Sequence, residues 1–255
     1  MERQVISVRK TAYGAEVTRL VGHTGAVCGV AFSPDGRSLA SAGDGGEIKL
    51  WDLETARELF TLHSHNYSEA VAFSPDGKLL ASGGLLGTIQ IWDANTGQER
   101  ISLPDCGRMM RLLFSPDGKT LCSAHQTSLR LWDTDTGTNR ACERPDWLAN
   151  GEYIESLAFS PDSRTLAAGH EVGIGLWDVA TGANPTAWFD DGVRPYLRSP
   201  DRYLINPENL FRERHSQHGP NLLAAAFKPN GDLMLVGECW ETVMMWRLTS
   251  VPSKN

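Results

Sequence analysis

The sequence predicts an all-β protein made of repeated four-stranded antiparallel sheets, and two recurring motifs predict it. The first is the run A-F-S-P-D-G at Ala31–Gly36. It recurs, complete or with some residues replaced, at Ala72–Gly77, Phe114–Gly118, Ala158–Ser163 and Ala226–Gly231. The second is a Trp-Asp pair at Trp51, Trp92, Trp132 and Trp177, with Trp246-Arg247 as a last copy. The steps from Trp to Trp are 41, 40, 45 and 69 residues. A period of about 40–45 residues indicates tandem units that stack on one another.

The strands and turns of one copy follow from local pattern. Apolar residues alternate along the first copy, as in strands, at Val30, Phe32, Leu39, Ile48 and Leu50. The segment 33–36 is a turn, because Pro fixes φ at its second position and Gly suits its fourth. A Gly-rich break at 43–46 and a third turn after Trp-Asp complete the copy. Three turns therefore join four short strands.

Together, the period and the two linked motifs resemble the WD40 family of β-propellers, and the resemblance covers nearly the whole chain. It implies that each copy is one four-stranded antiparallel blade. Four regular repeats are expected over 26–189, a last repeat over 221–249 and a tail over 250–255. Residues 1–25 align with the second half of a repeat. The resemblance implies that the strand Glu16–Leu20 completes the last blade and closes the ring, which removes exposed sheet edges.

The long step before Trp246 leaves the number of blades open. Another Ser-Pro-Asp stands at Ser199–Asp201, but only 29 residues separate Ser199 from Lys228. We expect a degenerate fifth blade in the segment 190–220, and hence six blades in a single domain over 1–255. The alternative is five blades with an insertion, loop or helix, at 190–220.

Composition narrows the classes of function. A net charge of −7 argues against an extended nucleic-acid footprint. The five cysteines have no paired spacing, which favours a reducing, cytoplasmic setting. Cys28 and Cys122 fall on predicted strands, where we expect small core residues. The sequence shows no apolar leader and no apolar run of membrane-spanning length, so we expect no membrane partner.

The family resemblance implies a buried hydrogen-bonded set in each repeat, which the first repeat matches with His23, Ser41, Asp44 and Trp51. These residues are expected to be structural. The pair His63 and His65 lacks further ligands, so we expect neither a metal nor another cofactor. The repeated Ser-Pro-Asp carboxylates are expected to form turns. Because no catalytic motif is present, we expect that the protein is not an enzyme.

Recognition is the function that the sequence favours, because loops on a rigid scaffold commonly carry binding residues. In the family, partners contact positions near the start of each first strand. Counting back six and four residues from the repeated Phe gives aligned pairs rich in Tyr and Arg, the types enriched in binding hot spots. The resulting partner-binding residues are Tyr67, Glu69, Arg108, Met110, Tyr153, Glu155 and, in the last repeat, Trp240.

We therefore expect a non-catalytic scaffold that binds a protein or peptide through its top rim, as a monomeric propeller within a larger complex. One alternative is a propeller enzyme or small-molecule binder that uses the central channel, with His125, His170 and Glu171 as candidate residues. Another is that these loop residues simply vary without a common role. A third is that the chain is one domain of a larger assembly.

Overall fold

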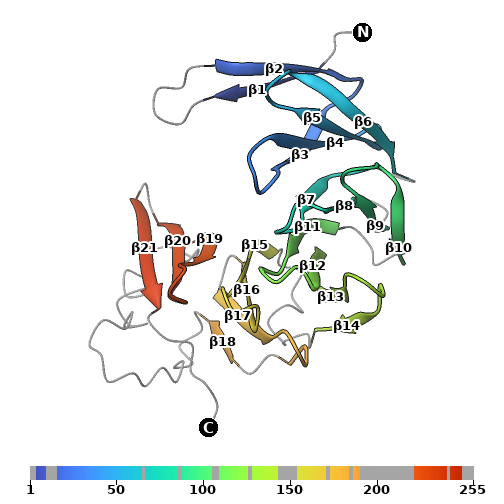
Figure 1. The fold of residues 1–255 in the computed structure, drawn as a ribbon. Helices are drawn as coiled ribbons and strands as arrows, with labels where there is room; N and C mark the ends of the chain where they lie inside the picture. Colours follow the sequence, from blue (N-terminus) through green and yellow to red (C-terminus); the bar gives the residue numbers. More distant parts are fainter. Residues whose placement is uncertain are drawn as a thin grey trace. The chain divides into compact units, whose positions relative to one another are not determined.

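The structure of the protein is a computed structural model, and every element that it describes is a β-strand. It describes residues 4–9, 16–64, 67–84, 88–104, 109–125, 128–142, 154–170, 173–183, 186–189, 221–239 and 242–248. No helix is found among these residues. The sheets are antiparallel, and four of them have four strands (Figure 1). The all-β prediction and the four-stranded repeat are thus confirmed.

Each sheet follows the order of the chain. A hairpin of β1 (Gln4–Arg9) and β2 (Glu16–His23) comes first. The first four-stranded sheet holds β3 (Val27–Phe32), β4 (Ser38–Gly43), β5 (Glu47–Asp52) and β6 (Arg57–His63). The second sheet holds β7 (Ala70–Phe73), β8 (Leu79–Gly83), β9 (Ile89–Asp93) and β10 (Glu99–Leu103).

Two more four-stranded sheets and a three-stranded one follow. The third sheet holds β11 (Met109–Phe114), β12 (Thr120–His125), β13 (Leu129–Asp133) and β14 (Asn139–Ala141). The fourth sheet holds β15 (Ile154–Phe159), β16 (Thr165–His170), β17 (Gly173–Asp178) and β18 (Thr186–Phe189). The last sheet holds β19 (Asn221–Phe227), β20 (Leu233–Cys239) and β21 (Thr242–Leu248). The chain divides into two compact units, one with β1–β12 and one with β15–β21, and the division passes through the third sheet.

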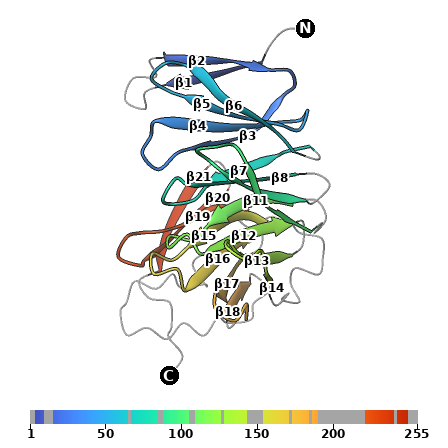
Figure 2. The same cartoon turned by 45° about the vertical axis from the view of Figure 1, so that its right-hand side comes forward.

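In the second unit, β19 lies against β15 and β16, and Figure 2 shows these strands from a second side. In the first unit, β7 lies against β3 in the same manner. The last sheet therefore neighbours the fourth sheet directly, as the alternative of five blades with an insertion predicts. The expected degenerate blade at 190–220 lies outside the described residues, so the number of blades stays a prediction.

Ring closure by the strand Glu16–Leu20 also stays a prediction. In the structure this strand is part of β2, which pairs with β1 in a separate two-stranded sheet. The last described sheet, β19–β21, has three strands and does not include β2.

Within the first unit, each sheet turns its tryptophan toward the sheet that precedes it. Trp92 of the second sheet packs with Ala40 and Leu50 of the first sheet. Trp132 of the third sheet packs in the same way with Ala81 and other residues of the second. Because a sheet covered on both faces needs apolar residues on both, every residue of β4 after Ser38 is buried, whereas burial in β3 alternates.

The β1–β2 hairpin takes the place of the preceding sheet for Trp51. Leu20 is fully buried against Leu39 and Trp51, and Ile6 and Val8 pack around this cluster. Gly22 allows the close approach, since a Cβ there would stand 2.9 Å from the Trp51 ring. The hairpin thus packs on the first sheet at β4, β5 and β6.

The Ser-Pro-Asp turns share one hydrogen-bond pattern. Ser74 Oγ donates to Asp76 Oδ1 over 2.7 Å and accepts from the Leu79 amide at 2.9 Å, while the Lys78 amide donates to Asp76 Oδ1 at 3.1 Å. The same contacts recur in the turns that begin at Ser33, Ser115 and Ser160. The fourth position has a positive φ in each turn, 71° at Gly77 and 61° at Ser163, which explains the preference for Gly.

We predict that these turns make the fold sensitive to acid. Hydrogen bonds from Ser74 and Lys78 lower the pKa of Asp76, so its folded-state pKa lies below the unfolded value of about 4. The stabilisation is therefore complete above that value and is lost as the pH falls through the folded-state pKa. Urea titration at several pH values should show this loss. Asp76→Asn keeps an acceptor oxygen but cannot titrate, and it should reduce the slope below pH ~4. An unchanged slope would contradict the assignment.

A second prediction concerns the hairpin contact. Leu20→Ala should lower the free energy of unfolding by about 2–5 kcal/mol, because it leaves a cavity beside Trp51. The matched control is Leu59→Ala on β6, whose side chain is 46% exposed, and it should cost far less. Equal effects of the two substitutions in urea titration would show that β2 does not pack on the first sheet in solution.

Candidate functional site

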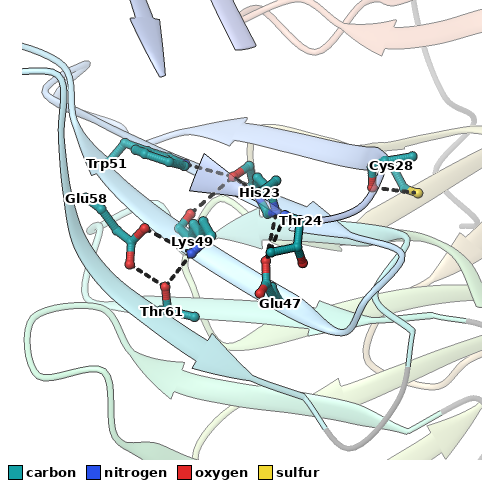
Figure 3. Close-up of polar contacts among 10 residues, drawn as sticks. His23, Thr24, Cys28, Glu47, Lys49, Trp51, Glu58 and Thr61 are labelled. Atoms are coloured by element: carbon teal, nitrogen blue, oxygen red, sulfur yellow. Dashed lines mark hydrogen bonds and ion pairs between the residues drawn. The ribbon is translucent and has the colours of Figure 1, made fainter. Parts of the chain in front are cut away.

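A buried polar set joins β2, β4 and β5 in the first unit. Trp51 Nε1 donates to Ser41 Oγ over 2.8 Å, and His23 Nε2 lies 2.6 Å from the same oxygen (Figure 3). All three side chains are buried. The end of β2 places the histidine, and the pairing of Ser41 with Lys49 on β5 brings the serine beside the tryptophan strand.

The distances indicate where the protons of this set lie. Ser41 Oγ accepts the indole proton, and its own hydrogen has two acceptors, His23 Nε2 at 2.6 Å and the Lys49 carbonyl at 3.5 Å. The shorter contact favours donation of the serine proton to Nε2, which places the ring proton of His23 on Nδ1, a buried nitrogen with no hydrogen-bond partner among the described residues. Burial, and then the charge of Lys49, lower the pKa of His23. The imidazole is therefore neutral near pH 7 and acts as a structural hydrogen-bond partner.

A second acidic residue, Glu47, lies beside His23, and the expected part of Asp44 in the set stays a prediction. Glu47 Oε2 lies 3.7 Å from His23 Nδ1 and also accepts the Thr24 amide at 3.4 Å. Asp44 donates its backbone amide to the Ala26 carbonyl at 3.0 Å. The family resemblance predicts Asp44, because the family's repeats have an Asp in this turn. The longer side chain of Glu47 reaches back from the start of β5, and reach of this kind cannot be read from spacing.

A charged cluster lies beside the set on β5 and β6. Lys49 Nζ donates to Glu58 Oε2 at 2.9 Å and to Thr61 Oγ1 at 2.7 Å, and Lys49 is buried (Figure 3). Burial opposes ionisation of Glu58, but hydrogen bonds from Thr61 and Lys49 outweigh it and lower the pKa of Glu58. In the second sheet the same positions hold a Gln90–Glu99 hydrogen bond of 2.6 Å. The neutral amide of Gln90 thus replaces the charged amine of Lys49. Because the contact does not require the charge, we interpret it as a structural contact between paired strands.

The other sheets of the first unit keep the Trp–Ser contact. Trp92 donates to Ser82 and Trp132 donates to Ser123, each over 2.8 Å. In the third sheet, His125 Nε2 lies 3.0 Å from Ser123 Oγ, so a histidine of the same strand takes the role of His23. His125 was a candidate for channel chemistry. Its burial and its bond to Ser123 instead indicate a structural role.

The structure describes part of the expected binding rim. Tyr67 is 53% exposed, and Glu69 is partly buried two residues later on the same loop. Met110 lies on β11 and Glu155 on β15, where the structure describes the strand and not the side chain. The remaining expected rim residues, Arg108, Tyr153 and Trp240, lie outside the described residues. So does Glu171, and His170 ends β16 with its side chain undescribed.

The backbone around Tyr67 is held firmly while its ring is exposed. Ser68 is fully buried, and its Oγ donates to Ser64 Oγ over 2.9 Å. The Glu69 amide donates to the Gly83 carbonyl at 2.9 Å. Gly84 makes room for the loop, since a Cβ there would stand 1.9 Å from the Tyr67 carbonyl oxygen. An exposed aromatic ring on an anchored backbone loses little conformational freedom when a partner binds.

Two further expectations can be compared with the structure. Cys122 is buried as expected, but Cys28 is exposed, so its assignment to the core was wrong. The next residue, Gly29, faces Glu69 and Ala70 at the start of β7, so Cys28 lies on the opposite face of β3. In the part of the chain that the structure describes, no group of three or more His, Cys, Asp or Glu residues could hold a metal ion. Among the same residues, no helix could cross a membrane.

These features define a class of protein: tandem four-stranded antiparallel sheets with a buried Trp–Ser contact in three successive sheets. The WD domain, G-beta repeat family matches residues 14–52, 56–93 and 103–133. Residues 14–133 of the chain therefore carry three WD40 repeats.

Similar proteins share short segments with this chain. The small ribosomal subunit protein RACK1z of Arabidopsis thaliana is 44% identical over 52 residues, which are 20% of this chain and 16% of that protein. The small ribosomal subunit protein RACK1 of Caenorhabditis elegans is 43% identical over 54 residues, or 21% of this chain and 17% of that protein. An uncharacterised WD repeat-containing protein of Synechocystis is 41% identical over 58 residues, or 22% and 17%. Each match thus spans less than a fifth of the relative.

The polar set predicts that Ser41 contributes more to the free energy of unfolding than Ser82, the equivalent serine of the second sheet. Ser82→Ala strands the indole N–H of Trp92 and should cost about 1–3 kcal/mol. Ser41→Ala strands both Trp51 and His23 and should cost about 1–3 kcal/mol more. Urea titration of the two variants measures the difference. Equal losses would show that His23 contributes nothing through Ser41.

Proposed function

We propose that this chain is a non-catalytic scaffold that binds a protein or peptide through its top rim, with Tyr67 at the centre of the described part. The single observation that supports the proposal is the exposed Tyr67 ring on a loop anchored by Ser68 and Gly84. Tyrosine combines a large apolar area with a polar tip and is common in binding hot spots. Glu69 adds an acceptor on the same loop.

The rest of the proposed rim comes from repeat register. Arg108, Met110, Tyr153, Glu155 and Trp240 are the corresponding residues of other repeats, and we propose that they join Tyr67 and Glu69 around one partner. We also propose that the chain works as a monomeric propeller within a larger cytoplasmic complex. The relatives whose names make them small ribosomal subunit proteins support this, because such proteins work inside an assembly.

The alternative of an enzyme or small-molecule binder has less support. Of its candidate residues, the structure describes the side chain of His125 alone, and that side chain is bonded to Ser123 in the core. A catalytic histidine needs access to a substrate, and His125 is only 3% exposed.

The proposal predicts that substitutions on the rim weaken partner binding without lowering the stability of the fold. A partner recovered with the intact chain from its native host would be titrated by calorimetry against Tyr67→Ala/Arg108→Ala. Each true hot spot should cost at least about 2 kcal/mol, roughly 30-fold in affinity, with the melting temperature nearly unchanged.

The matched control is Leu59→Ala, another exposed apolar side chain, which should leave the affinity unchanged. Unchanged affinity in the double variant would place the interface elsewhere and contradict the proposed rim.

A further inference from the structure

The turn between β19 and β20 differs from the regular Ser-Pro-Asp turns at three positions. It reads Lys-Pro-Asn-Gly-Asp over residues 228–232, so a lysine replaces the serine and Asn230 replaces the aspartate. Its last residue, Asp232, stands where each of the regular turns has a cation, namely Arg37, Lys78, Lys119 and Arg164. The middle residue of this turn therefore has an acid two positions later, where the regular turns have a base.

The amide of Asn230 makes two contacts that fit this exchange of charges. Its Nδ2 donates to Asp232 Oδ2 at 2.9 Å, and its Oδ1 accepts the Asp232 amide at 3.2 Å. Asn230 is exposed, whereas Asp232 is only 5% exposed. Burying a carboxylate is costly unless it accepts hydrogen bonds. The asparagine thus supplies a donor that an aspartate at position 230 could not supply.

Asn230 is followed by glycine, the residue that least obstructs attack on an asparagine side chain. Gly231 has no Cβ to hinder the approach of its backbone nitrogen to Asn230 Cγ. The Gly231 amide donates to the Lys228 carbonyl at 2.9 Å, so the attack requires the turn to open. In a regular turn, the Ser74 hydroxyl resists opening because it accepts the Leu79 amide. A lysine ammonium cannot accept a hydrogen bond, so opening costs less in the last turn.

We propose that Asn230 is a site of spontaneous deamidation, with water as the co-reactant. The Gly231 nitrogen forms a bond to Asn230 Cγ, and the bond from Cγ to Nδ2 breaks. The amide proton of Gly231 leaves with the side-chain nitrogen as ammonia, and a succinimide ring remains. Water then adds to one of the two carbonyl carbons of the ring and opens it. The products are aspartate and isoaspartate at position 230.

Either product weakens the turn, because it places a carboxylate beside Asp232. Asp232 loses the donor that lies 2.9 Å away and gains a like charge in its place. The regular turns avoid this conflict, as Lys78 Nζ lies 3.5 Å from the Asp76 carboxylate. Isoaspartate also lengthens the backbone between Phe227 and Leu233, which pair directly across the hairpin. The reaction therefore destabilises the β19–β20 hairpin with time.

Mass spectrometry of the full chain tests the chemistry. The chain would be kept at neutral pH, sampled over days and cleaved with pepsin in acid, which halts the reaction. Fragment masses locate the gain that marks replacement of NH2 by OH. We expect this gain at Asn230 well before it occurs at Asn95, an exposed asparagine in a turn that precedes threonine. A gain at Asn230 no faster than at Asn95 would overturn the proposal. Asn150, which also precedes glycine, lies outside the described residues and is followed in its own fragments.

Thermal unfolding of substituted chains tests the consequence. Asn230→Asp should lower the melting temperature by about 2–4 °C. Asn230→Asp/Asp232→Asn restores a donor opposite the carboxylate and should recover most of this loss. The matched control is Asn95→Asp, which should change nothing, because the equivalent residue of the third sheet is Asp135.

Equal effects of Asn230→Asp and Asn95→Asp, or no recovery in the double variant, would contradict the charge conflict with Asp232. The deamidated wild-type chain, separated by ion exchange on its added negative charge, gives the same comparison if Asn230→Asp does not fold. A melting temperature equal to that of the unreacted chain would then overturn the predicted loss of stability.

Discussion

The contact between each tryptophan and the preceding sheet is the constraint on which the first unit depends. Trp51 packs on the β1–β2 hairpin, and Trp92 and Trp132 pack on the first and second sheets. An indole buried in this way would leave its N–H without a partner, which is costly. A serine on the neighbouring strand accepts it in all three sheets. Each sheet thus needs its predecessor for burial and its own second strand for polar satisfaction.

Much of this fold could be predicted from the sequence, because its signals are local. The Ser-Pro-Asp turns and the turns that follow each Trp-Asp pair fix strand ends through contacts between residues a few positions apart, such as Asp93 Oδ1 with the Thr96 amide at 2.9 Å. Alternation then assigns faces within the strands. Since the signals repeat at a fixed period, errors in one copy are corrected by the others.

The sequence was less informative wherever long-range packing or side-chain reach decides the outcome. Cys28 has the pattern of a core residue, yet its side chain is exposed. The approach of Glu47 to His23 depends on the length of the glutamate side chain. In the third sheet, His125 contacts Ser123 from the same strand, a position for the histidine that the family pattern does not predict. The exposure of Tyr67 followed from repeat register, but its anchoring by Ser68 and Gly84 required the structure.

Stability and recognition use different residues in this chain. The turns and the Trp–Ser contacts are mostly buried or bonded within one repeat, so they hold the backbone. Tyr67, by contrast, contributes exposed area on a backbone that is already fixed.

Hydrogen exchange of the indole N–H groups, followed by NMR, tests the central packing claim most directly. If Trp51, Trp92 and Trp132 are buried against the preceding sheet and bonded to serine, their indole protons should exchange only when the sheet opens, as slowly as the backbone amides of β4, β8 and β12. Exchange at the rate of a free indole in any of the three would contradict the packing described for that sheet.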